Sequence, residues 1–203
     1  MTFAAYVTLA MIHLLAAISP GPSFVLSVKT AASEGFRPAF GLALGFGIGA
    51  TIWAGAALLG LSLVLELVPP IFTALKLIGA AFLVWLAIQM WRHAPEPMPK
   101  AEAGPPRGLV SAIRLGTLAM LANPKPAIFF GAIFVGLVPA AAAWPEKALV
   151  LFNILWVEAA WYVVVARAFS LPRARAAYAR FKTWLDRSLG LALGALGLRL
   201  ALP

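Results

Sequence analysis

Long apolar segments follow one another along most of this chain, with short polar stretches between them. They cover residues 3–27, 38–65, 71–91, 108–138, 148–168 and 184–202, and the last is the weakest. Each runs for roughly 20 residues or more, which is the length that a helix needs to cross a bilayer. The pattern therefore predicts an all-α integral membrane protein with six transmembrane helices.

The first and the fourth apolar segments are interrupted by closely spaced prolines. Ser19-Pro20-Gly21-Pro22 lies in the first, and Asn123-Pro124-Lys125-Pro126 lies in the fourth. Proline lacks a backbone N–H and clashes with the preceding turn, so two prolines at alternate positions should stop a helix. Ser19 or Asn123 suits an N-cap, and the proline that follows suits the first position of a new helix. We therefore expect two broken helices, each restarting with free N–H groups that point into the gap.

The halves of the chain on either side of a proline-rich linker have matching patterns. Residues 1–92 and 108–203 each contain three apolar segments, the first of them broken. Three is odd, so repeats of one structure would have to be inserted in opposite orientations. We expect one transporter domain over residues 1–203, built from these inverted repeats and a flexible cytoplasmic linker, 93–107. The two restarted helices would then point their positive ends at one another near the midplane, where they can bind a carboxylate.

Basic residues are concentrated in alternate connections of this chain, whose formal net charge is +9. Most lysines and arginines lie in and beside the first, third and fifth connections, so the positive-inside rule places both termini outside the cytoplasm. The segment 170–182 is rich in basic residues and predicts a surface helix on anionic lipid. We attribute the charge to topology and to lipid attraction, and expect no nucleic-acid partner.

Three ionisable residues inside the predicted spans are candidates for function. Lys125 opens a helix deep in the membrane, where the helix dipole and the hydrocarbon both oppose its charge. We expect it to face a cavity and pair with a substrate carboxylate or with Glu158; a lysine that snorkels or binds a carbonyl of the broken helix is the alternative. Glu158 and His13 are candidates for proton transfer. A permanent ion pair is the alternative for Glu158, and packing is the alternative for His13.

Glycines recur every four residues on two of the predicted spans. Gly41, Gly45 and Gly49 share one face of the second span, and Gly190 and Gly194 share one face of the sixth. Such stripes let helices approach closely, so we interpret both as packing surfaces. The stripe on the sixth span fits a homodimer contact equally well.

Several classes of function find no support in the sequence. The chain has no cysteine, which excludes thiol-disulfide carriers and thiolate-based metal pumps. It also shows no enzyme motif and no phosphate-binding loop. We therefore expect no catalytic residue, cofactor or metal site, and any uphill transport must use an ion gradient.

Motifs in four places carry a family resemblance: Ser19-Pro20-Gly21-Pro22, residues 75–83, Asn123-Pro124-Lys125, and Leu185-Asp186-Arg187 with Gly197-Leu198-Arg199-Leu200. Over nearly the whole chain they resemble the LysE/RhtB superfamily of amino-acid exporters. The resemblance implies an inner-membrane translocator that expels amino acids or close derivatives in exchange for protons. Ser23 departs from the family, many of whose members have Asp or Asn at that place.

Together the residues and the resemblance predict a secondary exporter of an amino acid or related metabolite across the bacterial inner membrane, driven by proton antiport, with both termini periplasmic. The alternatives are a non-transporting assembly subunit and an inorganic-ion exporter, which the scarcity of oxygen and imidazole ligands disfavours. The expected proton-coupling residues are Glu158 and His13. The expected substrate-binding residues are Ser19, Pro20, Gly21, Pro22, Ser23, Asn123, Pro124 and Lys125.

Overall fold

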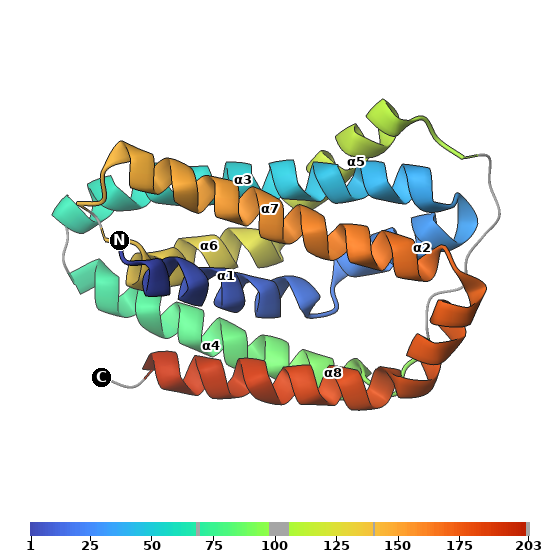
Figure 1. Ribbon diagram of the computed structural model, residues 1–203. Coiled ribbons are helices and arrows are strands. Elements are labelled where there is room, and N and C mark those ends of the chain that lie inside the picture. Colours follow the sequence, from blue (N-terminus) through green and yellow to red (C-terminus); the bar gives the residue numbers. More distant parts are fainter. Residues whose placement is uncertain (68–69, 98–105, 140, 202–203) are drawn as a thin grey trace.

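The computed structural model describes residues 1–67, 70–97, 106–139 and 141–201, which form helices packed side by side in an elongated bundle (Figure 1). No strand occurs among these residues, so the all-α prediction is confirmed. The helices are, in order, α1 (Phe3–Ile18), α2 (Pro22–Ser33), α3 (Phe36–Leu67), α4 (Pro70–His93), α5 (Leu109–Leu121), α6 (Pro124–Leu137), α7 (Trp144–Phe169) and α8 (Pro172–Ala201).

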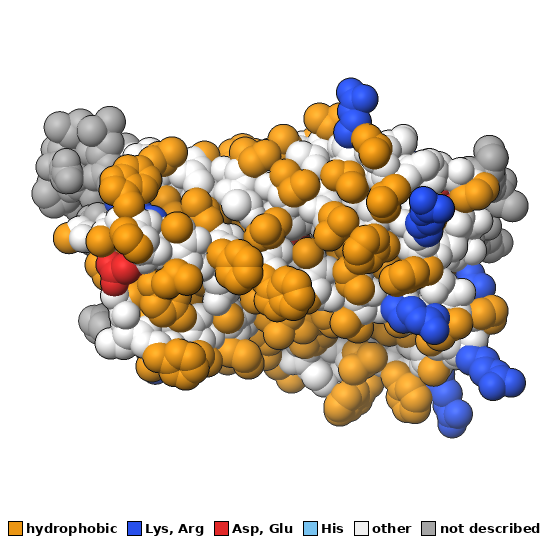
Figure 2. Space-filling view, turned by 45° about the horizontal axis from the view of Figure 1, so that its top comes forward, with side chains coloured by type: hydrophobic (Ala, Val, Ile, Leu, Met, Phe, Trp, Pro, Cys, Tyr) orange, Lys and Arg blue, Asp and Glu red, His pale blue; other side chains and the backbone are white. Residues whose placement is uncertain are grey.

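The length and composition of the described helices fit a membrane protein. Two of them, α3 over Phe36–Gly60 and α7, are long and apolar enough to cross a membrane, and α1 with α2 qualifies as a third span bent by 66°. Large apolar side chains such as Phe152, Trp156 and Leu118 are more than 60% exposed. Figure 2 shows hydrophobic side chains over much of this surface, with most of the visible lysines and arginines toward one end. The membrane class is therefore supported, whereas six spans in inverted repeats remain a prediction.

The first break starts where the prolines predict, but the new helix begins later than expected. Ser19 ends α1 by donating its backbone N–H to the carbonyl of Leu15 at 3.3 Å. The N-cap of α2 is Gly21 rather than Ser19, and Pro22 is its first residue. A residue before proline is disfavoured in the helical region. Ser19 and Gly21 both have extended ψ values, of 122° and −174°, so the helix restarts only at the second proline.

The second break follows the expectation. Helix α5 ends at Leu121, and α6 begins at Pro124. The side-chain oxygen of Asn123 accepts a hydrogen bond from the backbone N–H of Lys125 at 3.0 Å. Asn123 therefore caps α6, with proline at the first helical position.

Helices of each half of the chain pack against helices of the other half. Helices α3 and α7 pack against each other, and each also packs against the broken pair of the other half: α3 against α5 and α6, and α7 against α1 and α2. Helices α4 and α8 pack together and run side by side along one flank in Figure 1. This arrangement places the two breaks close to one another inside the bundle.

The glycine stripes pack helices within the chain, as expected. A Cβ atom on Gly45 would overlap the carbonyl oxygen of Ile113, and one on Gly49 would lie 2.6 Å from the Cβ of Met120, so the backbones of α3 and α5 are in direct contact. A Cβ atom on Gly190 would lie 3.1 Å from the carbonyl oxygen of Ala87 in α4. This face of α8 is therefore occupied by α4, which is not the homodimer contact considered above.

An ion pair joins the end of α2 to the last residue of the linker, directly before the second half. Arg107 donates its backbone N–H to Glu34 at 2.9 Å, and its guanidinium makes further contacts of 2.7 to 3.0 Å to both carboxylate oxygens. Burial alone would raise the pKa of Glu34, but the hydrogen bonds and positive charge of Arg107 outweigh it, so the pKa is lowered. Residues 98–105 of the predicted flexible linker lie outside the described residues.

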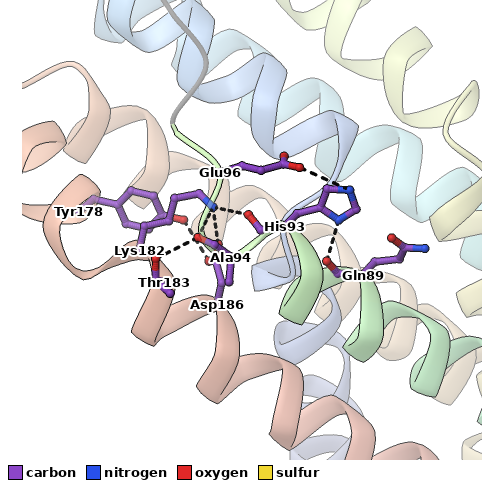
Figure 3. Close-up of polar contacts among 8 residues, drawn as sticks. All are labelled: Gln89, His93, Ala94, Glu96, Tyr178, Lys182, Thr183 and Asp186. Atoms are coloured by element: carbon purple, nitrogen blue, oxygen red, sulfur yellow. Dashed lines mark hydrogen bonds and ion pairs between the residues drawn. The ribbon is translucent and has the colours of Figure 1, made fainter.

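The other end of the linker begins at a polar cluster that joins α8 to α4 (Figure 3). The ammonium of Lys182 donates to the carbonyl oxygens of His93 at 3.0 Å and Ala94 at 3.1 Å and pairs with Asp186 at 2.8 Å. These contacts use its three N–H groups. A cation at the last carbonyls of a helix also complements the helix dipole. Lys182 therefore stabilises the end of α4.

The basic segment 170–182 largely forms the first part of α8, and its contact with anionic lipid remains a prediction. Helix α8 runs from Pro172 to Ala201 and includes most of the segment, although Figure 1 shows this first part at an angle to the rest. The ring of Tyr178 packs against Phe169 and Phe24, with ring centres 4.9 and 5.9 Å apart. These aromatic contacts hold the segment against the bundle, which the charge pattern alone did not reveal.

The contact of α3 with α5 predicts a sharp difference between two glycines of α3. Gly45→Ala should destabilise the fold by about 1–3 kcal/mol or more, because the added methyl group would overlap backbone atoms of α5, which cannot move aside. Gly55→Ala is the control, since its Cβ would meet only Leu151 Cδ2, at 4.0 Å. Thermal unfolding in detergent micelles measures both, and equal midpoints would contradict the close contact.

The ion pair of Glu34 with Arg107 predicts a pH-dependent contribution to stability. Glu34→Gln should cost roughly 1–2 kcal/mol at neutral pH. Because the folded pKa lies below the ordinary value of 4.5, the contribution is present above pH 4.5 and is lost as the pH falls through the lowered pKa. Unfolding measured against pH tests this, with Glu96→Gln, whose side chain is 62% exposed, as the control. A cost independent of pH would refute the assignment.

Candidate functional site

The two helix breaks meet, and side chains from one half satisfy polar groups of the other. The side-chain N–H of Asn123 donates to the hydroxyl of Ser23 at 3.1 Å. The ammonium of Lys125 donates to the carbonyl oxygen of Ser19 at 2.7 Å. Ser23 lies in the first turn of α2 and Lys125 in the first turn of α6, so the two restarted helices begin at one junction.

Lys125 faces a cavity, but its contact is the alternative that the sequence left open. Its ammonium donates to a carbonyl of the broken first helix, and Glu158, the other expected partner, pairs with His13. The position explains how a partly buried cation is tolerated there. Lys125 opposes the dipole of α6 at that helix's positive end, but it also lies at the carbonyl end of α1, where a cation is favourable.

A second buried pair lies beside this junction. Nε2 of His13, from α1, is 2.8 Å from a carboxylate oxygen of Glu158, from α7. The two residues are only 3% and 5% exposed. The imidazole lies against the rings of Phe129 and Phe130, with centres 5.9 and 5.5 Å away. Its Nδ1 is buried without a hydrogen-bond partner. Two groups able to carry a proton are thus held together in an apolar setting.

A small cavity joins the breaks to this pair. It has a volume of about 30 Å³, and its lining includes Gly21, Ser23, Asn123, Lys125, His13 and Glu158. A space of this size has room for about one or two water molecules. The site is therefore closed to a whole amino acid in this conformation.

The remaining expected residues lie around the junction rather than in the cavity lining. Ser19 contributes its carbonyl, and its hydroxyl is buried without a hydrogen-bond partner. Pro20 lines a wider gap between α2, α4 and α8. Pro22 and Pro124 are the first residues of α2 and α6, where they set the helix starts.

Tyr162 is a residue of the site that the sequence prediction missed. It is 3% exposed, lines the cavity and packs on Phe46, with ring centres 4.6 Å apart. Ser23 lines the same cavity. Tyr162 follows Glu158 by four residues on α7, and helix periodicity places such a pair on one face. That spacing could have identified Tyr162 as a site residue from the sequence.

The donor set does not resemble a metal site. Among the residues that the structure describes, no three His, Cys, Asp or Glu side chains are grouped so that they could hold a metal ion.

Comparison with known proteins gives a consistent result. The family described as LysE type translocator matches residues 14–203. The threonine efflux protein of Salmonella typhi is 37% identical over 202 residues, and that of Escherichia coli (strain K12) is 36% identical; each match covers 96% of both chains. The chemotactic transduction protein ChpE of Pseudomonas aeruginosa is 34% identical over 131 residues, which is 64% of each chain. No solved structure matches.

The match over most of the chain confirms the resemblance found in the motifs. It also agrees with the described apolar helices. The chain belongs to the LysE type translocator family and is a transporter, not an enzyme.

Proposed function

We propose that this protein exports an amino acid across the bacterial inner membrane by proton antiport, with threonine as the first candidate. The relatives named threonine efflux proteins support the substrate class. One structural observation carries the assignment: Lys125, Asn123, Ser23, His13 and Glu158, from both halves of the chain, surround one buried cavity. Intramembrane ionisable residues that face a cavity mark solute and proton pathways.

The junction can bind a carboxylate. Lys125 and the free N–H groups at the starts of α2 and α6 supply positive charge and donors, as helix N-termini do for anions generally. The substrate carboxylate would replace the Ser19 carbonyl that Lys125 now binds at 2.7 Å. A charge-assisted bond to a carboxylate is stronger than a bond to a neutral carbonyl. Ser23 and Asn123 could then bind the hydroxyl of a threonine side chain.

Glu158 supplies a mechanism for coupling. The substrate ammonium group would bind the carboxylate that His13 now contacts at 2.8 Å. A protonated Glu158 cannot form that ion pair, so proton and substrate compete for one carboxylate. Such competition is what antiport requires, because each ligand must leave before the other binds. His13, with its second nitrogen unpartnered, provides a route for the proton.

The packing of the helices supports alternating access by inverted repeats. Helix α3 contacts the broken pair of the second half, and α7 contacts the broken pair of the first. This reciprocity is expected of repeats related by a pseudo-two-fold axis. We assign residues 1–92 and 108–203 to the repeats and propose that they rock about the junction to widen the cavity. The basic end of the molecule in Figure 2 would face the cytoplasm, with both termini periplasmic.

The alternatives fit the site less well. An assembly subunit gains nothing from a lysine, a glutamate and a histidine buried around one cavity, since such groups are costly in a membrane. An inorganic-ion exporter would need more oxygen or imidazole ligands than the described cavity offers.

The carboxylate site predicts that Lys125→Ala will reduce threonine efflux about 10- to 100-fold, as expected for loss of a charge-assisted hydrogen bond. Cells producing the protein would be loaded with threonine-containing and other dipeptides, and the amino acids released outside would be measured by mass spectrometry at matched membrane abundance. Lys29→Ala, at an exposed lysine of α2, is the control and should export normally. If the protein leaves the external profile of every amino acid unchanged, the proposed function fails.

The coupling mechanism predicts that Glu158→Gln will separate exchange from proton drive. In proteoliposomes the parent protein should accumulate threonine when a pH gradient is imposed. The variant should lose that response, because Gln cannot take up the proton, but should still exchange labelled for unlabelled threonine at raised concentration. Glu96→Gln should behave like the parent. Retained pH-driven accumulation by Glu158→Gln would remove this residue from the mechanism.

A further inference from the structure

One face of α2 is polar along its whole length, although it is packed inside the bundle. Ser23, Ser27, Thr30 and Glu34 follow at intervals of four, three and four residues, which places them on one side of the helix. Ser23, Ser27 and Thr30 are 4%, 0% and 2% exposed. Ser23 lines the central cavity, and Glu34 lies where α2 ends. The polar face thus connects the site to one end of the molecule.

The hydroxyl of Ser27 is buried without a hydrogen-bond partner. Serines and threonines in helices commonly bond the carbonyl four residues earlier. Ser33, Thr51 and Thr117 do so here, at 2.8, 2.8 and 3.0 Å. An unbonded buried hydroxyl is unfavourable. Ser27 therefore lacks the internal bond that would explain it as a packing residue, and it is available to a polar group in another conformation.

The far end of this polar face is closed by contacts between the two halves. Glu34, from the first half, forms the two-pronged ion pair with Arg107, the linker residue directly before the second half, and their side chains are 8% and 34% exposed. Arg175 of α8 also approaches the end of α2, with its guanidinium 3.4 Å from the carbonyl oxygen of Ala32. Separation of the halves at this end would break the pair and uncover the polar face.

We propose that this face of α2 lines the path by which the amino acid reaches the central site, and that the ion pair of Glu34 with Arg107 closes that path. The inference rests on the proposed function. Ser27 and Thr30 would offer hydroxyls to the ammonium and carboxylate groups of a hydrated zwitterion as it passes. On the proposed orientation this half of the path opens to the cytoplasm.

The opposite side of α2 offers a rival route. A gap of about 440 Å³ lies between α2, α4 and α8, and α2 lines it with Phe24, Val25 and Val28. This wall suits an acyl chain better than a zwitterion. The gap does include the polar cluster of Figure 3, but the ammonium of Lys182 is already bonded to two carbonyls and to Asp186.

Single cysteines distinguish the two routes, because the chain has no cysteine of its own. Ser27→Cys and Val28→Cys change adjacent residues that are 0% and 1% exposed but point about 100° apart around α2, one on the polar face and one toward the gap. Membrane vesicles of both orientations would be treated with a charged, membrane-impermeant methanethiosulfonate reagent, with and without Arg107→Ala.

We expect Ser27→Cys to react, about tenfold faster with Arg107→Ala, which corresponds to roughly 1.4 kcal/mol favouring the open form. Val28→Cys should remain unreactive, and threonine should slow the reaction of Ser27→Cys. If Ser27→Cys does not insert into the membrane, Thr30→Cys takes its place.

Three results would overturn the path. Reaction of Val28→Cys alone would place the route in the gap. Equal reaction of both cysteines would indicate local unfolding of α2. If neither cysteine reacts even when Arg107→Ala is present, the polar face does not open. Threonine efflux by the parent chain is measured in the same vesicles. Efflux without labelling of Ser27→Cys refutes the path alone, whereas labelling without efflux of any amino acid refutes the proposed function and keeps the path for another solute.

Discussion

The hydrogen bond from the ammonium of Lys125 to the carbonyl of Ser19 is the interaction on which the arrangement depends. A broken helix frees backbone polar groups, and the hydrocarbon of a bilayer offers them no partner. Here the group freed by the break in one half is satisfied by a side chain from the break in the other. The second break is capped by its own Asn123, whereas the first depends on this contact with the second half. The need to satisfy the first break therefore explains why the two meet and why the cavity lies between the halves.

In the closed structure Lys125 contacts Ser19, and Glu158 contacts His13. On the proposed function, a zwitterion that enters would displace both contacts and supply replacements for both. A ligand shifts a conformational equilibrium only by its differential affinity for the two states. Competition for these two contacts provides that difference, since a substrate that replaces them weakens the links across the junction.

Sequence patterns predicted the features that follow from local chemistry. The proline tetrads located both breaks, Asn123 capped α6 as expected, and the stripe of Gly41, Gly45 and Gly49 packed α3 onto α5. The partners of buried charges were not predictable in this way. His13 and Glu158 are 145 positions apart in the chain, so their pairing depends on how α1 meets α7. The start of α2 at Pro22 was missed because Ser19 and Gly21, each of which precedes a proline, are both non-helical, whereas only Ser19 was expected to be.

The two halves differ in the side chains that follow each helix break. Helix α2 carries hydroxyl groups after its break, whereas the sequence of α6 after Lys125 has no serine or threonine, and Phe129 and Phe130 lie against His13. On the proposed assignment, one half of the path is polar and the other is lined at the site by aromatic rings. A hydrophobic constriction closes by excluding water. The polar half would then admit a hydrated zwitterion from the cytoplasm, and the aromatic half would slow its passage in both directions, so the ion gradient alone sets the direction of net flux. Repeats of one architecture can thus line the two halves of a path differently, because their sequences differ after the break.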